Sequence, residues 1–256
     1  HSTNRSSGTA ADADPSQASV NDDFSWGPRS TLELSGVCYS YDSGQRALSD
    51  ISIVLRGGMR VGLVGLSGAG KSTLASLLAG FIAPSAGGIR LDGAAVSNLC
   101  SQGWRHQVAY IPQTPYIFHA TLAQNIAFYR PDATLEQIED AARAMGLMDL
   151  VGDLPQGLHT VIGDPSRRVL ILDEPTAHLD IETEMELKET LLPLFSDRLV
   201  VFATHRLHWV DQMDLVLVME SGHLVQAGSP AHLKGTQGYL ALAGAINGSE
   251  TEAHHA

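Results

Sequence analysis

The chain has 256 residues, of which 44% are hydrophobic and 17% are charged, a balance typical of a folded core in one large α/β domain or two small ones. The 16 Lys and Arg against 28 Asp and Glu give a net charge of −12, which excludes a protein that grips nucleic acid by charge alone. Two cysteines are too few for a disulfide framework, and no apolar run approaches the roughly 20 residues of a membrane span.

Both ends of the sequence are polar. Residues 1–30 are rich in Ser, Ala, Asp and Gly and have neither helical nor strand periodicity. We interpret them as a linker or a cloning remnant that is largely disordered. The sequence starts with His1 rather than Met, as expected of an excised or processed piece. Residues 247–256 are interpreted as a polar tail.

Between these ends, segments typical of strands alternate with segments typical of helices. Strands are predicted at 32–37, 51–55, 60–64, 89–91, 108–111, 169–172, 199–203, 215–219 and 223–226. Helices are predicted at 71–79 and within 121–151. This alternation indicates an α/β fold with a mostly parallel sheet covered on both sides. An antiparallel β portion near the N-terminus and a helical insertion at about 114–165 are added to it.

A phosphate-binding loop is the clearest motif. Residues 65–72 fit G-x-x-x-x-G-K-[ST] between a predicted strand and a predicted helix. Its glycines allow backbone N–H groups to turn toward a phosphate, and the helix adds its positive dipole end. We expect Lys71 to reach the β- and γ-phosphates from an exposed position with little packing, and Ser72 to bind Mg²⁺. The other residues of this predicted nucleotide site are Gly65, Ser67, Gly68, Ala69, Gly70 and Thr73.

Two carboxylates follow the apolar run 169–172. A strand buried on both faces delivers its last residues to the carboxyl edge of the sheet, where ligands bind. Asp173 is therefore predicted to hold Mg²⁺. Glu174 is predicted to orient and deprotonate an attacking water, a role typically worth about 10²–10⁴-fold in rate.

These motifs and their order resemble the ATP-binding domain of ABC transporters. The phosphate loop is followed by Ile-Pro-Gln at 111–113, by Leu-Asp-Glu-Pro-Thr-Ala-His-Leu-Asp at 172–180 and by Thr-His at 204–205. The resemblance covers roughly residues 31–245. It implies a P-loop NTPase core of the ABC ATPase type at residues 31–246, with ATP and Mg²⁺ as its cofactors.

The resemblance also implies roles for single residues. Gln113 is expected to sense Mg²⁺ and the attacking water and to couple them to the membrane domain. Asp180 belongs to the segment that touches the opposite subunit and its nucleotide. His205 is expected to contact the γ-phosphate. Tyr41 matches the aromatic residue that stacks on adenine, although Tyr39, one strand period away, is the alternative ring.

A finer resemblance concerns the transported substrate. Residues 115–126 resemble ABC exporters, and residues 174–180 with 203–209 resemble the CydD-type subunit of the bacterial cysteine and glutathione exporter needed for cytochrome bd assembly. This implies a transmembrane domain, in the same chain or a separate one, and a CydC-type second ATPase subunit. The location implied is the cytoplasmic face of the bacterial inner membrane. The alternatives are a non-catalytic ATP-binding clamp in a heterodimer and a soluble ABC ATPase that acts on nucleic acid or ribosomes.

One motif of the family is missing. The signature segment, L-S-G-G-Q or similar, and its helix belong between Gly163 and Asp164. Either this segment is deleted, or its residues are absent from the recorded sequence. A segment that becomes ordered only on dimerisation and nucleotide binding is expected to be mobile, which favours the second explanation.

Overall fold

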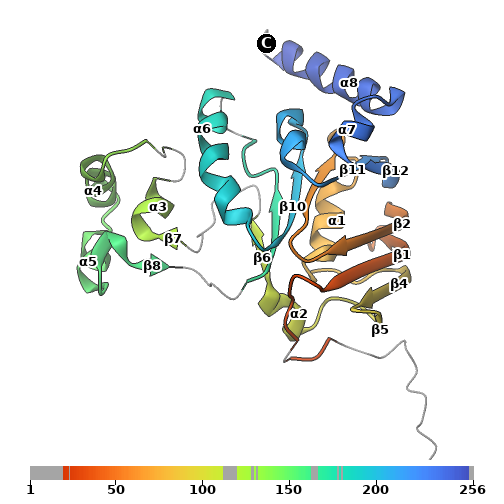
Figure 1. Cartoon of the computed structure of the whole chain (residues 1–256), viewed down its shortest axis with the longest axis horizontal. Coiled ribbons are helices and arrows are strands. Elements are labelled where there is room, and N and C mark those ends of the chain that lie inside the picture. Colours follow the sequence, from red (N-terminus) through yellow and green to blue (C-terminus); the bar gives the residue numbers. More distant parts are fainter. Residues whose placement is uncertain are drawn as a thin grey trace, which may run out of the picture.

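The structure is a computed structural model (Figure 1). It describes residues 20–253 apart from residues 23, 112–119, 128, 129, 131, 163–166, 178 and 180. In this part of the chain, no helix combines the length and the apolar character needed to cross a membrane.

The elements alternate along the chain much as the sequence predicts. The strands are β1 Thr31–Ser40, β2 Arg46–Arg56, β3 Arg60–Val64, β4 Ala86–Leu91, β5 Ala94–Val96, β6 Val108–Ile111, β7 Ala120–Thr121, β8 Val161–Ile162, β9 Val169–Asp173, β10 Leu199–Thr204, β11 Leu215–Glu220 and β12 His223–Gly228. The α-helices are α1 Lys71–Leu78, α2 Gln102–Gln107, α3 Leu122–Ile126, α4 Leu135–Ala144, α5 Met148–Asp153, α6 Ile181–Leu191, α7 Pro230–Leu233 and α8 Gln237–Ala253. Short 3₁₀ turns are η2 Gly157–His159, η3 Leu192–Phe195 and η4 Leu207–Gln212.

Two larger sheets carry the fold. One has the order β2-β1-β4-β5 and is antiparallel. The other has the order β12-β11-β3-β10-β9-β6, in which only β12 runs antiparallel to its neighbour. These sheets confirm the α/β fold class, with its mostly parallel core and its antiparallel N-terminal portion. Because β3 and β9 both lie beside β10, the phosphate loop and the acidic strand end emerge at the same edge.

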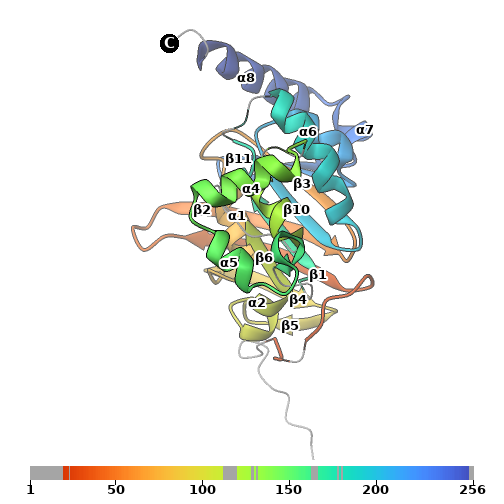
Figure 2. The ribbon, with the colours of Figure 1, turned by 90° about the vertical axis from the view of Figure 1, so that its left-hand side faces the viewer.

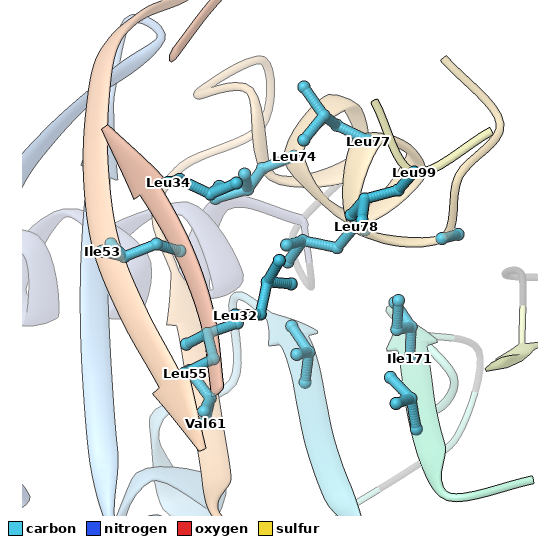
Figure 3. Packing of buried hydrophobic residues seen from close by; sticks show 14 of the residues in the cluster. Leu32, Leu34, Ile53, Leu55, Val61, Leu74, Leu77, Leu78, Leu99 and Ile171 are labelled. Carbon is cyan, nitrogen blue, oxygen red and sulfur yellow. The ribbon is translucent and has the colours of Figure 1, made fainter. Parts of the chain in front are cut away.

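Helix α1 lies between the two sheets (Figure 3). Its residues Leu74, Leu77 and Leu78 are buried and belong to one apolar cluster with Leu32 of β1 and Ile171 of β9. A second apolar cluster covers the other face of the parallel sheet and includes residues of α6, η3 and η4. Helix α1 is thus held by the first cluster alone, and the two clusters together cover both faces of the parallel sheet.

The helical insertion forms a unit of its own. In Figure 1, α3, α4 and α5 lie together with β7 and β8 on the side of β6 and α6. Figure 2 shows the same helices in front of the parallel sheet. Their small apolar cluster is separate from the two large ones and is built on Leu122, Ala123, Ile138 and Leu158.

The interpretation of both chain ends needs correction. Val20 and Trp26 are 4% and 2% exposed, and Trp26 packs edge-on against Trp104 at a centroid distance of 5.5 Å. Residues 20–22 and 24–30 are therefore not a disordered linker, because apolar side chains among them belong to the core. At the other end, α8 continues to Ala253, so residues 247–253 extend a helix rather than form a tail. Residues 1–19 and 254–256 lie outside the described residues.

Candidate active site

The phosphate loop connects β3 to α1 and is held against two other segments. Gly70 has a φ of +98°, and a Cβ at this position would lie 2.9 Å from the carbonyl oxygen of Ala47 in β2. Only glycine fits such a left-handed conformation with so close a backbone neighbour. On the other side, the Gly222 N–H in the β11–β12 turn donates to the carbonyl oxygen of Ala69 at 3.0 Å. The loop is thus fixed before any ligand binds.

A cleft of about 640 Å³ opens in front of this loop. Its lining combines residues from the N-terminal sheet, the phosphate loop, the end of β9 and the β11–β12 turn. The predicted residues that line it are Tyr41, Ser67, Gly68, Gly70, Lys71, Ser72, Thr73, Asp173 and Glu174. The structure therefore brings together residues more than 130 positions apart in the sequence.

Lys71 is buried, contrary to the prediction that it packs little. Its side chain is 4% exposed, and its Nζ donates to the carbonyl oxygens of Gly65 and Leu66 at 2.9 and 3.1 Å. The same Nζ lies 3.3 Å from Glu174 Oε1. The loop folds around the ammonium group because three oxygen atoms compensate its desolvation.

Glu174 stands at the centre of the polar groups. Its φ is +48°, a strained conformation for a residue other than glycine, and its N–H donates to the carbonyl oxygen of Ala203 at 2.9 Å. His205 Nδ1 lies 3.5 Å from Glu174 Oε2. A hydrogen bond from His205 lowers the pKa of Glu174 to about 2, against the opposing effect of partial burial, and the charge of Lys71 adds to the lowering. The carboxylate is therefore ionised near neutral pH.

Ser72 and Asp173 fit a magnesium ion. Ser72 Oγ donates to Asp173 Oδ1 at 3.0 Å, so a hydroxyl and a carboxylate oxygen converge at the floor of the cleft. Both are hard oxygen ligands, and Mg²⁺ in nucleotide sites takes one or two carboxylates together with phosphate oxygens and water. Within the described residues, no group of three or more His, Cys, Asp or Glu forms a metal cage. A magnesium ion held by Ser72 and Asp173 would take its other ligands from a nucleotide and from water.

The two candidate rings differ in position. Tyr41 is 45% exposed and lines the cleft, and its hydroxyl lies 2.9 Å from Thr73 Oγ1. Tyr39 packs against the core and meets Tyr41 edge-on at a centroid distance of 5.2 Å. The geometry therefore favours Tyr41 as the ring that is free to stack on a base.

Two of the predicted site residues, Gln113 and Asp180, are outside the described residues. Ala69 is 5% exposed, and its N–H donates to the carbonyl oxygen of Leu66 at 3.1 Å, so this N–H is already used within the loop.

The cleft also contains residues that the sequence analysis missed, namely Gln45, Arg46, Ala47, Ser221 and Gly222. The Ser-Gly turn at 221–222 was visible in the sequence, but nothing there placed it beside the phosphate loop.

Comparison with known proteins identifies the family. A family profile described as "ABC transporter" matches residues 48–163. The chain is 44% identical to the "Glutathione/L-cysteine transport system ATP-binding/permease protein CydC" of Bacillus subtilis, over 80% of this chain and 39% of that protein. It is 35% identical to an "ATP-dependent lipid A-core flippase" of Chromobacterium violaceum, over 88% of this chain and 42% of that protein. The chain carries an ATP-binding domain of the ABC transporter type.

A solved structure agrees with this family of ATP-binding domains. This structure is described as a bacterial Atm1-family ABC exporter with ATP bound. The match covers 89% of this chain and 44% of the exporter chain, with 28% sequence identity and a TM-score of 0.60. The ABC ATPase fold of the exporter type is thereby confirmed. The chain spans about two fifths of the length of each of these three proteins.

The comparisons also bear on the missing signature segment. The alignment with the B. subtilis protein has 224 positions but takes in 80% of the 256 residues of this chain, about 205. About 19 positions of the alignment therefore have no residue here. The family profile stops at residue 163, where the sequence analysis places the gap. The number of unmatched positions agrees with a missing segment of about this size, and the end of the profile agrees with its place. The junction itself, at residues 163–166, lies outside the described residues.

Proposed function

We propose that this chain binds ATP and Mg²⁺ and hydrolyses ATP to power an ABC exporter of small thiols such as cysteine and glutathione. One observation carries the ATPase part of the proposal. Lys71, Ser72, Asp173 and Glu174 line a single cleft, and His205 adjoins Glu174. These five groups supply what phosphoryl transfer to water needs, namely a phosphate cradle, a metal site and a carboxylate with its orienting partner.

Each side chain has a definite task. Lys71 and the N–H groups of the loop bind the β- and γ-phosphates, while Ser72 and Asp173 would hold Mg²⁺, which would supply positive charge beside the reacting phosphate. Glu174 orients the attacking water, and His205 contacts the γ-phosphate. Without nucleotide, Lys71 is paired with Glu174. When Lys71 turns to the phosphates, Glu174 loses this cation and its pKa rises, which makes it a better base.

The exporter part of the proposal rests on the relatives. The B. subtilis relative transports glutathione and L-cysteine by name, and the sequence resembles the CydD type over residues 174–180 and 203–209. The relative is a CydC protein, so we assign the chain to the exporter without choosing between its two subunit types. The partners are then a transmembrane domain and a second ATPase subunit of the other type, at the cytoplasmic face of the inner membrane. Lipid flippases among the relatives make a lipid the competing cargo.

The test uses the complete transporter, assembled from the gene that encodes this chain and its partner subunit. Glu174→Gln keeps the size of the side chain and removes the base, so ATP hydrolysis should fall about 10²–10⁴-fold while ATP still binds. Inverted membrane vesicles should accumulate radiolabelled glutathione with ATP, and those carrying the variant should not. Normal turnover in the variant would remove Glu174 from the reaction, and transport of lipid instead of thiol would replace the substrate class.

A further inference from the structure

Tyr110 makes a polar contact that the proposed mechanism does not use. It is on β6, which pairs with β9 in parallel, opposite Ile171. Its hydroxyl donates to Asp173 Oδ2 at 3.1 Å, while Ser72 Oγ donates to Asp173 Oδ1 at 3.0 Å. Each oxygen of this carboxylate therefore has its own hydroxyl donor, one from β6 and one from α1.

The Tyr110 ring is held in this position from the other side as well. Phe81 meets it edge-on at a centroid distance of 4.9 Å and an interplanar angle of 71°. The ring is thus fixed by an aromatic neighbour while its hydroxyl is bonded to Asp173.

A metal ion held between Ser72 and Asp173 would replace only one of the two hydroxyl contacts. Ser72 Oγ and Asp173 Oδ1, which bond each other in the free chain, are the atoms proposed to hold Mg²⁺. The Tyr110 hydrogen bond is made to Oδ2, so it fixes the rotation of the carboxylate without occupying the metal-facing oxygen. Hydrogen bonds of this kind orient the ligands of many metal sites.

We propose that Tyr110 is a positioning residue for magnesium, whose hydroxyl holds the Asp173 carboxylate with Oδ1 toward Ser72. This inference rests on the proposed ATP and Mg²⁺ site. It differs from a mere packing role in a measurable way. A packing residue supports nucleotide binding whether or not the metal is present, whereas a residue that orients the metal ligand matters only when Mg²⁺ is there.

The experiment compares the full chain with its Tyr110→Phe variant, which lacks one oxygen atom and keeps the ring against Phe81. The Kd of ATP is measured by calorimetry, once with excess Mg²⁺ and once with excess EDTA. We expect the variant to lose about 10-fold in affinity with Mg²⁺, the range for substitutions behind a metal ligand, and nothing in EDTA. Phe81→Leu, which alters the packing and leaves the hydroxyl, is the control and should keep the magnesium dependence of the wild type.

The outcomes separate this inference from the proposed function. Equal affinity of variant and wild type under both conditions would overturn the role of Tyr110, and so would an equal loss under both. In either case the ATP site itself stands if the wild type binds ATP more tightly with Mg²⁺. A wild-type chain that binds no ATP at all would instead overturn the proposed function. Titration of Mn²⁺ into the ATP-bound chain, followed by electron paramagnetic resonance, gives a second measure of metal affinity.

Discussion

At the scale of single residues, Lys71 shows how a ligand-binding side chain can also be structural. It is buried and bound to two carbonyl oxygens and to Glu174 before any phosphate arrives. A phosphate must therefore replace contacts that already exist, rather than meet a free ammonium group.

Lys71→Ala should weaken Mg-ATP binding strongly and also lower the melting temperature of the free chain. The second effect follows because the substitution leaves Glu174 without its cation and two loop carbonyls without their donor. Calorimetry measures the first effect and thermal unfolding the second. ATP affinity equal to that of the wild type would contradict the assignment of Lys71, and an unchanged melting temperature would contradict its structural role.

Tyr41 offers a test of how the base is recognised. Tyr41→Ala should weaken ATP and ADP alike, by about 1–3 kcal/mol, because both share the adenine on which the ring stacks. Tyr39→Ala is the matched control, since Tyr39 faces the core and not the cleft. The Kd of ATP and the Kd of ADP, measured for both variants, show which ring stacks on the adenine. A larger loss of affinity in the Tyr39 variant would reverse the assignment of the two rings.

At the scale of elements, a buried polar cluster ties the segment after β9 to α6 and η4. Glu184 of α6 is fully buried and accepts hydrogen bonds from Thr176, from Arg206 and, at 2.7 Å, from Trp209 Nε1. The Arg206 guanidinium also donates to the carbonyl oxygen of Leu179 at 2.8 Å. The residue after His205 is thus joined to Leu179, so this cluster connects the end of β10 to the segment after β9.

Glu184→Gln should cost about 3 kcal/mol of unfolding free energy, the lower end for removing one member of a buried ion pair, because Arg206 keeps some contact with solvent at 18% exposure. Equilibrium unfolding in denaturant measures this change. Glu182→Gln, an exposed position on the same helix, should change stability by less than about 0.5 kcal/mol. Similar values for the two variants would mean that the cluster does not hold the elements together.

At the scale of the whole molecule, acid should destabilise the fold through groups of lowered pKa. Glu174 has a pKa of about 2 instead of 4.5. Burial would raise the pKa of Asp214, but hydrogen bonds from the side chain and backbone of Arg60, together with its charge, outweigh this and lower it. A carboxyl group whose pKa is lower in the folded than in the unfolded state stabilises the fold at pH values above the unfolded-state pKa. This stabilisation is lost as the pH falls to the folded-state pKa. The free energy of unfolding should therefore decrease from about pH 4.5 toward pH 2.

Glu174→Gln isolates one part of this acid dependence. The variant should be less stable than the wild type at neutral pH, and the difference should shrink as the pH approaches 2. Unfolding in denaturant at a series of pH values measures it. Glu220 is an exposed carboxylate at the end of β11, so Glu220→Gln should show the same dependence of unfolding free energy on pH as the wild type. A difference in unfolding free energy between Glu174→Gln and the wild type that stays constant from pH 7 to pH 2 would contradict the lowered pKa of Glu174.

The sequence by itself determined the features that depend on local pattern. The phosphate loop between a strand and a helix, the buried strands at 169–172 and 199–203, and the acidic pair at 173–174 follow from glycine spacing, apolar runs and charge. Their order along the chain was enough to indicate the family and the fold class. The absence of the signature segment was also evident, because the order of motifs along the sequence is enough to show that one of them is missing.

Only the tertiary structure decided what depends on contacts between distant segments. Tyr110 and Asp173 are 63 residues apart, and Ser72 and Asp173 are 101 apart. Trp26 completes the core against Trp104, and Lys71 is buried although its motif predicted an exposed position. No local pattern encodes these contacts, because they arise when adjacent parallel strands bring their ends to one edge and when the apolar clusters close around them.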